Sequence, residues 1–194
     1  MANAASKVRY GCKKMVFSVP TDGKYEKPWQ NPGAERIAIS NGSSSSSSIA
    51  ADDNPNFFTS SGGGAGKELT VQAARFIQAF YTKILGQTKD SDTGALVEGP
   101  NDAAKNFAFG FETTGDQGGY RVWVLNNSAT VPTYTAATNP SSGITEDAES
   151  STFTASPITC SDGIERTMVT FEPGDAGYEK AFDTVPFMTM ATTA

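Results

Sequence analysis

The feature that most constrains the fold of this chain is a period-two pattern between residues 105 and 126. Large apolar side chains occupy every second position from Phe107 to Phe111 and again from Tyr120 to Val124. Successive side chains of a strand point to opposite faces, so this alternation is typical of a strand with one buried face. Between the two runs lies the turn-forming sequence Gly-Asp-Gln-Gly-Gly. The sequence therefore predicts an antiparallel hairpin formed by residues 105–114 and 120–126.

Other segments predict further strands. Residues 7–19 predict a first strand, and residues 35–40 place Ile37 and Ile39 on one face of a short one. Residues 151–159 and 165–171 predict a second hairpin that turns at Ser161-Asp162-Gly163.

Two segments predict helices. In residues 70–85 apolar side chains recur at steps of three and four, with Gly86 just past the end. Their stripe is predicted to pack in the core, although residues 68–73 could instead form a strand that leads into the helix. Residues 175–185 predict a short C-terminal helix stopped by Pro186. No repeating strand–helix–strand pattern is present, so we expect a mainly β fold, an antiparallel sandwich or barrel with one central helix and a short C-terminal helix.

The 194 residues suit a single domain, residues 1–194, which contains one long tract without periodicity. Residues 41–66 include six consecutive serines and the run Gly62-Gly63-Gly64, and they predict a flexible loop. The apolar pair Phe57 and Phe58 interrupts this polar tract. Because such a pair is costly to leave in water, we expect this loop to contact a neighbouring subunit.

The chain contains no histidine, which excludes a Ser-His-Asp triad, a His-assisted cysteine nucleophile and any zinc site with a histidine ligand. Cys12 and Cys160 are far apart in sequence and are expected to be free thiols. Residues 62–67 lack the hydroxyl residue that ends a phosphate loop, and residues 90–94 lack the closing glutamate of a calcium loop. We therefore expect no enzyme, and no catalytic, cofactor or metal site.

The formal charge of −6 is unevenly distributed along the chain. Residues 1–40 carry seven basic and three acidic side chains, whereas residues 106–194 carry three basic and eleven acidic ones. An acidic surface does not grip nucleic acid, because that binding depends on cations. The basic start of one copy could instead attract the acidic end of another. The candidates for this contact are Lys13, Lys14, Glu146, Asp147 and Glu149, and the other explanation is ordinary solubility charge.

Several short motifs, taken in their order along the chain, resemble the major tail protein family of long-tailed bacteriophages, whose members form the tail tube. The resemblance spans about residues 8–185. It rests on residues 10–15 (YGCKKM), 32–34 (PGA), 50–53 (AADD), 70–86, 124–132 (VLNNSATVP) and 152–157 (TFTASP). The serine and glycine runs depart from the family pattern.

This resemblance implies a sandwich or barrel-like subunit that forms hexameric rings stacked head to tail into a tube. Genomic DNA would pass through the tube without specific binding. The implied partners are further copies of the chain and other tail proteins (tape measure, tail terminator and distal tail), with no membrane. The implied location is the virion tail, assembled in the host cytoplasm. Two other classes stay open: a β-sandwich module that binds carbohydrate or a receptor on a phage tip or cell surface, and a hydrolase that uses carboxylates.

Overall fold

The computed structural model describes residues 8–42, 46–51, 54–61, 66–116, 118–136, 143 and 147–191; of residues 9, 46–51 and 54–61 it describes the backbone only. Strands dominate these residues, and a short helical segment is built around the π-helical turn η1 (Phe80–Ile84). The strands are β1 (Arg9–Ser18), β2 (Pro20–Thr21), β3 (Lys24–Tyr25), β4 (Trp29–Asn31), β5 (Ala34–Asn41), β6 (Ser46–Ala51), β7 (Asn54–Ser61), β8 (Lys67–Ala73), β9 (Thr88–Lys89), β10 (Leu96–Val97), β11 (Phe107–Gly115), β12 (Arg121–Ala129), β13 (Glu149–Ala155), β14 (Ile158–Thr159), β15 (Glu165–Arg166) and β16 (Met168–Phe171).

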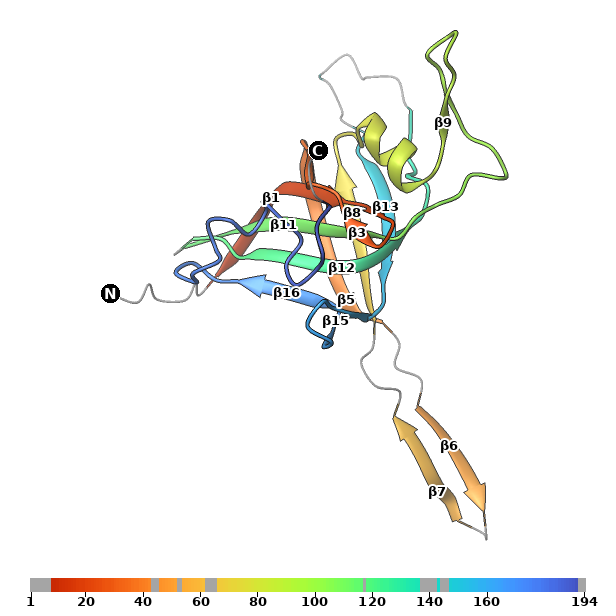
Figure 1. The fold of residues 1–194 in the computed structure, drawn as a ribbon, viewed down its shortest axis with the longest axis vertical. Helices are drawn as coiled ribbons and strands as arrows, with labels where there is room; N and C mark the ends of the chain where they lie inside the picture. The colour runs from red at the N-terminus through yellow and green to blue at the C-terminus, as the bar shows by residue number, and fades with distance from the viewer. Residues whose placement is uncertain are drawn as a thin grey trace.

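Eight strands form one antiparallel sheet that forks at β12. The strand order is β4-β1-β11-β12-β13-β8-β5, and β16 also pairs with β12. Residues 121–124 of β12 pair with β16, whereas residues 127–129 pair with β13. In Figure 1 β1, β11, β12 and β16 run across the molecule, and β5, β8 and β13 cross them. The mainly antiparallel β architecture expected from the alternation is confirmed.

Aromatic residues fill the space between the two crossing groups of strands. Phe17 of β1, Phe107 and Phe109 of β11 and Phe153 of β13 are all fully buried there together with Phe80 of η1. Their ring centroids lie 5.1–6.3 Å apart, within the range of favourable aromatic pairs. A second, smaller core around Trp123 and Leu125 lies on the opposite face of β12, packed against Val185 of the C-terminal segment.

The predicted hairpin of residues 105–114 and 120–126 is confirmed as β11 and β12, with Phe111 directly opposite Val122. The predicted first strand is β1, and the short strand of residues 35–40 is β5. The second hairpin is only partly right. It does turn at residues 161–163, but only β14 and β15 pair across it, because β13 pairs with β8 and β12 and β16 pairs with β12.

The predicted central helix over residues 70–85 is wrong in its first half, and the alternative of a strand over residues 68–73 that leads into the helical segment is confirmed. Residues 67–73 form β8, in which Leu69, Val71 and Ala73 are buried at every second position between β13 and β5. The amides that follow are bound by side chains: Phe76 N–H donates to Glu149 Oε2 (2.6 Å) and Ile77 N–H donates to Asn31 Oδ1 (2.8 Å). A helix across this point would need those amides for its own backbone, so the chain becomes helical only after it.

The predicted C-terminal helix over residues 175–185 is also wrong, since these residues form successive turns. Their amides donate to carbonyls three residues back, as from Tyr178 to Asp175 and from Ala181 to Tyr178. The carbonyls of Tyr178 and Ala181 also accept hydrogen bonds from the Arg121 guanidinium and from Trp123 Nε1. Side chains of β12 thus use the acceptors that an α-helix would have used.

Part of the predicted loop of residues 41–66 forms a hairpin of its own. β6 and β7 pair antiparallel with each other, and in Figure 1 they stand well apart from the eight-stranded sheet. The side chains of Phe57 and Phe58, and the glycines at 62–64, lie outside what the structure describes. The expected contact of this pair with another subunit stays a prediction.

Candidate functional site

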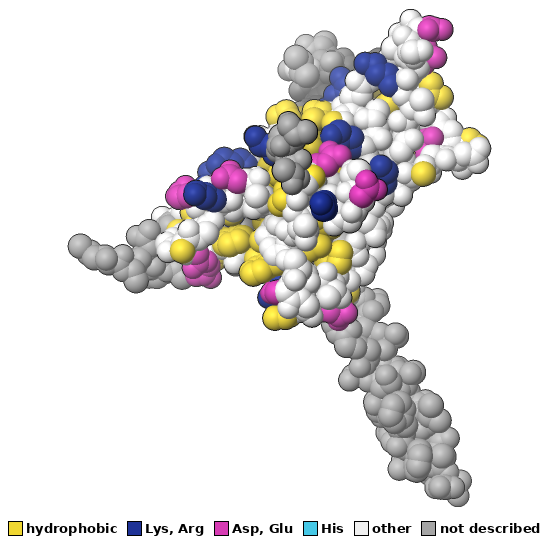
Figure 2. Space-filling model, in the orientation of Figure 1, with side chains coloured by type: hydrophobic (Ala, Val, Ile, Leu, Met, Phe, Trp, Pro, Cys, Tyr) yellow, Lys and Arg dark blue, Asp and Glu magenta, His cyan; other side chains and the backbone are white. Residues whose placement is uncertain are grey.

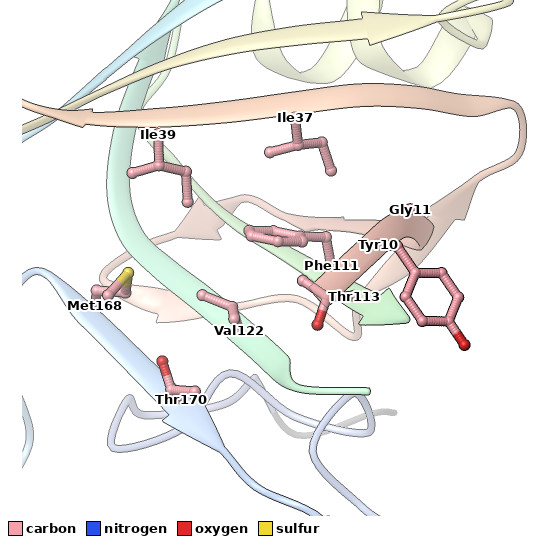
Figure 3. Close-up of a pocket in the computed structure, with 9 residues that line it drawn as sticks. All are labelled: Tyr10, Gly11, Ile37, Ile39, Phe111, Thr113, Val122, Met168 and Thr170. Atoms are coloured by element: carbon pink, nitrogen blue, oxygen red, sulfur yellow. The ribbon is translucent and has the colours of Figure 1, made fainter. Parts of the chain in front are cut away.

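An apolar groove of about 420 Å³ lies where the fork of the sheet opens, between β5 and β16. Figure 3 shows Ile37 and Ile39 pointing from β5 toward Phe111 and Val122, with Met168 and Thr170 of β16 on the other side. Tyr10, Gly11 and Thr113 complete the lining. The strands β5, β11 and β16 each contribute residues two positions apart, because i and i+2 share a face of a strand.

The floor of the groove is buried and its rim is exposed. Phe111 and Val122 are each 4% exposed, whereas Tyr10, Ile39 and Met168 on the rim are 56%, 39% and 41% exposed. Apolar surface held open to water in this way is unfavourable by about 25 cal/mol per Å². Binding of any partner that covers the rim is therefore favoured by burial of this apolar surface.

Strand edges border the groove on both sides. Among the described strands β16 pairs with β12 alone and β5 pairs with β8 alone. The far edge of β5 approaches β1, where the backbone N–H of Ile37 bonds to the Cys12 thiol. Burial raises the pKa of this thiol, and the same hydrogen bond opposes the rise. β1 thus covers part of the β5 edge, whereas the far edge of β16 lacks a ladder partner among the described strands, and an incoming extended segment could hydrogen-bond to it.

The lining of the groove is mainly apolar and contains few polar groups. Its polar groups are the phenol of Tyr10, the hydroxyls of Thr113 and Thr170 and the backbone, and none of the nine lining residues is an acid, an amine or a thiol. Such a surface can bury apolar side chains and accept an extended backbone. Both cysteines are free thiols as predicted, with Cys160 buried and Cys12 half-buried.

Of the predicted contact residues, Lys13 and Lys14 both pair with Glu112 of the same chain. Their Nζ atoms lie 3.1 and 3.2 Å from its carboxylate, and Arg121 Nε lies 3.2 Å from it. Consecutive strand residues normally point to opposite faces. Here a bulge between Lys13 and Val16, with Lys14 in the left-handed region at φ 54°, lets both lysines reach one carboxylate.

The acidic candidates are spread over different environments. Glu149 is bound inside the chain by Phe76 N–H and by the Tyr81 hydroxyl at 3.0 Å. Asp147 is described but Glu146 is not. On the face shown in Figure 2, Lys and Arg side chains lie next to Asp and Glu side chains. Basic and acidic residues that are separated along the sequence therefore lie side by side on this face. The expected attraction between the basic start of one copy and the acidic end of another stays a prediction.

Residues 90–94 form the polar turn expected there. One carboxylate oxygen of Asp90 accepts hydrogen bonds from the amides of Asp92 and Thr93 and from the Thr93 hydroxyl. In the part of the chain that the structure describes, no group of three or more Cys, Asp or Glu side chains is arranged to hold a metal ion.

Sequence reasoning missed the groove as a site. The alternation of Ile37 and Ile39 was visible, but it indicated a buried face. Only the fork at β12, which no local pattern encodes, leaves that face uncovered.

Comparison with family models and with curated proteins gave no match. No helix in the described ranges is long and apolar enough to cross a membrane.

Proposed function

We propose that this chain is a structural subunit that assembles with further copies of itself through the apolar groove. The observation that carries the proposal is the exposed apolar rim of Tyr10, Ile39 and Met168, which lies between β5 and the edge of β16 that lacks a ladder partner among the described strands. A single apolar ligand would cover the rim but leave the edge of β16 without a ladder partner. An extended segment of another protein chain satisfies both, by strand addition with alternate side chains in the groove.

A second copy is the occupant that the molecule favours. The β6–β7 hairpin continues from β5, the wall of the groove, and stands away from the sheet, so each copy carries an element with reach toward a neighbour. A contact in which the groove of one copy receives a different part of the next is heterologous, and such contacts generate rings or open stacks. The groove alone is smaller than a stable interface requires, and the hairpin would supply further area.

The resemblance to major tail proteins gives this assembly its most specific form. In it, hexameric rings stack head to tail into the tail tube of a long-tailed bacteriophage, which conducts DNA during ejection. The partners are then the tape measure, tail terminator and distal tail proteins, and the location is the virion tail. An acidic chain supports this form, because a basic lumen would hold phosphates and slow the passage of DNA.

Assembly should depend on an apolar rim. In Ile39→Asp and Met168→Asp the new carboxylate would have to be buried without a partner, so we expect at least a tenfold higher protein concentration to be needed for assembly. Negative-stain microscopy and light scattering across a concentration series measure this, with circular dichroism to check the fold. Val97→Asp is the matched control, because Val97 is 49% exposed outside the groove. Rings or tubes from both rim variants at wild-type concentrations would refute the role of the groove.

The hairpin gives a second test. Changing Phe57 and Phe58 together to Ser should leave the subunit folded and prevent assembly, because the double variant removes apolar surface from the element expected to reach a neighbour. Thr59→Ser, one residue along on the same strand, is a control that keeps the apolar pair. Tubes that form normally from the double variant would show that the pair does not contact another copy.

A further inference from the structure

Two hollows flank one exposed tyrosine that does not line the groove. They have volumes of about 310 and 340 Å³, and Tyr134 lines both. The first is also lined by Arg75, Glu98 and Glu149, and the second by Gln72, Thr133 and Ser150. None of these residues lines the groove.

The backbone that carries Tyr134 is fixed while its side chain is open to solvent. Thr133, the preceding residue, exchanges two backbone hydrogen bonds with Ser150 of β13, at 2.8 and 2.9 Å. The Tyr134 side chain is nevertheless 70% exposed, the largest value among the exposed large apolar and aromatic residues of the described chain. A large ring held on a paired backbone and left uncovered is a preformed stacking surface.

The carboxylates of the first hollow are held in place by hydrogen bonds, and each has an oxygen that can accept further ones. Glu149 accepts both of its hydrogen bonds, from Phe76 N–H and the Tyr81 hydroxyl, on Oε2. Glu98 accepts from Gln87 Nε2 on its own Oε2 at 3.0 Å. The second oxygen of each carboxylate thus has no partner among the described residues. Arg75 is exposed and forms no ion pair within the described ranges.

Apolar residues form the rest of the wall of this hollow. Leu96 of β10 and Val131 are 37% and 44% exposed, and Pro132 lies beside them. A pocket with apolar and aromatic walls and a few fixed polar groups is the usual form of a small-molecule site. The ligand must offer an apolar face for Tyr134, donors for two carboxylate oxygens and an acceptor for the guanidinium.

We infer that the hollows beside Tyr134 bind a hexopyranose sugar. One face of a pyranose ring presents C–H groups that pack on an aromatic ring, and its hydroxyls both donate and accept hydrogen bonds. Among the residues that line the two hollows, Arg75 faces three carboxylates, those of Glu98, Glu149 and Asp147, and offsets only one of them. The site therefore favours a neutral or amino sugar over an anionic one. The site is separate from the assembly groove, so it does not rest on the proposed function.

Saturation-transfer NMR on the full chain tests this, since it reads out weak binding even on a large assembly. Glucose, galactose, mannose, N-acetylglucosamine and glucosamine are titrated in turn. We expect saturable transfer to at least one of them, and about tenfold weaker binding by Tyr134→Ala, which loses the stacking surface. Arg75→Gln should weaken binding of the same sugar. Phe187→Ala, which removes an exposed aromatic ring that lines neither the hollows nor the groove, is the matched control and should bind like the wild type.

Two outcomes overturn the inference. One is the absence of saturable transfer to all five sugars. The other is binding by Tyr134→Ala as tight as that of the wild type. Because Tyr134 lies outside the groove, Tyr134→Ala should assemble normally, so failure of the sugar site and failure of the assembly groove are told apart in the same set of proteins.

Discussion

Replacing Phe153 by alanine is expected to lower the free energy of unfolding by about 3–5 kcal/mol. Phe153 is fully buried on β13, where the two crossing groups of strands meet. Its ring centroid lies 5.1 Å from that of Phe107 and 5.2 Å from that of Phe109, both edge-on, and it also packs against Phe17 and Phe80. The truncation would leave a cavity bordered by four rings that belong to the two strands β1 and β11 and to η1, which cannot all move inward together.

Urea denaturation measures this loss, and thermal unfolding should show a melting temperature lower by about 6–20 °C. Phe153→Leu keeps most of the volume and should cost less than about 1.5 kcal/mol. Phe187→Ala removes a ring that is 46% exposed and should cost less than Phe153→Ala. A loss below about 1 kcal/mol in Phe153→Ala would mean that the aromatic cluster does not hold the two groups of strands together.

The second large effect is expected at Glu112, whose side chain is 6% exposed and is bound by three cations. Glu112→Gln removes the negative charge but leaves Arg121, with an 11% exposed side chain, beside a neutral amide. Breaking a buried ion pair from one side is costly because the remaining charge stays desolvated. We expect a loss of about 3 kcal/mol at pH 7, the lower end of the usual range, since Lys13 and Lys14 are about half exposed and can turn to water.

The contribution of Glu112 to the free energy of unfolding should depend on pH. Burial by itself would raise the pKa of Glu112, but hydrogen bonds and positive charge from Lys13 and Lys14 outweigh it and hold the pKa below its usual value. The unfolded chain therefore binds the proton more tightly than the folded one. The stabilisation by ionised Glu112 is complete above the unfolded pKa of about 4.3 and is lost as the pH falls through the lower, folded pKa.

Urea denaturation of the wild type and Glu112→Gln from pH 7 to pH 3 should therefore show their difference in stability shrinking toward acid. Glu26→Gln is a matched control, because Glu26 pairs with Lys83 at 2.8 Å but both side chains are more exposed. Its effect should stay within about 1 kcal/mol. A difference between the wild type and Glu112→Gln that is constant across this range would show that the charge of Glu112 is not what stabilises the fold.

Local patterns predicted the strands well where a strand is stabilised by its immediate neighbour in sequence. The β11–β12 hairpin followed from the alternation of Phe107, Phe109 and Phe111 and from a glycine-rich turn, both of which are encoded within twenty-five residues. The apolar stripe of Phe76, Phe80 and Ile84 was also correctly placed in the core. The absence of histidine excluded whole classes of catalytic site without any structure.

The tertiary structure decided what those patterns left ambiguous. Leu69, Val71 and Ala73 fit a helix stripe as well as a strand face, and pairing with β13 and β5 selected the strand. The C-terminal helix was lost because Arg121 and Trp123, more than fifty residues earlier, bind the carbonyls of Tyr178 and Ala181. In the sequence Gly110 looks like an ordinary small residue of a strand. In the structure a Cβ at this position would lie 2.7 Å from Val16 Cγ2 and 3.0 Å from the Trp123 ring, which is too close.

The groove and the Tyr134 hollows belong to the same class of features. Each is lined by strands or segments that lie far apart in sequence, and neither contains a motif that could have been read beforehand. For this protein the sequence by itself determined the strands with a clear alternation, such as β11 and β12, and the histidine-dependent chemistry that the chain lacks, because these depend on residue type and short-range periodicity. Which apolar face stays uncovered, and which charges meet, depended on the fork of the sheet at β12, because only long-range strand pairing brings those residues together.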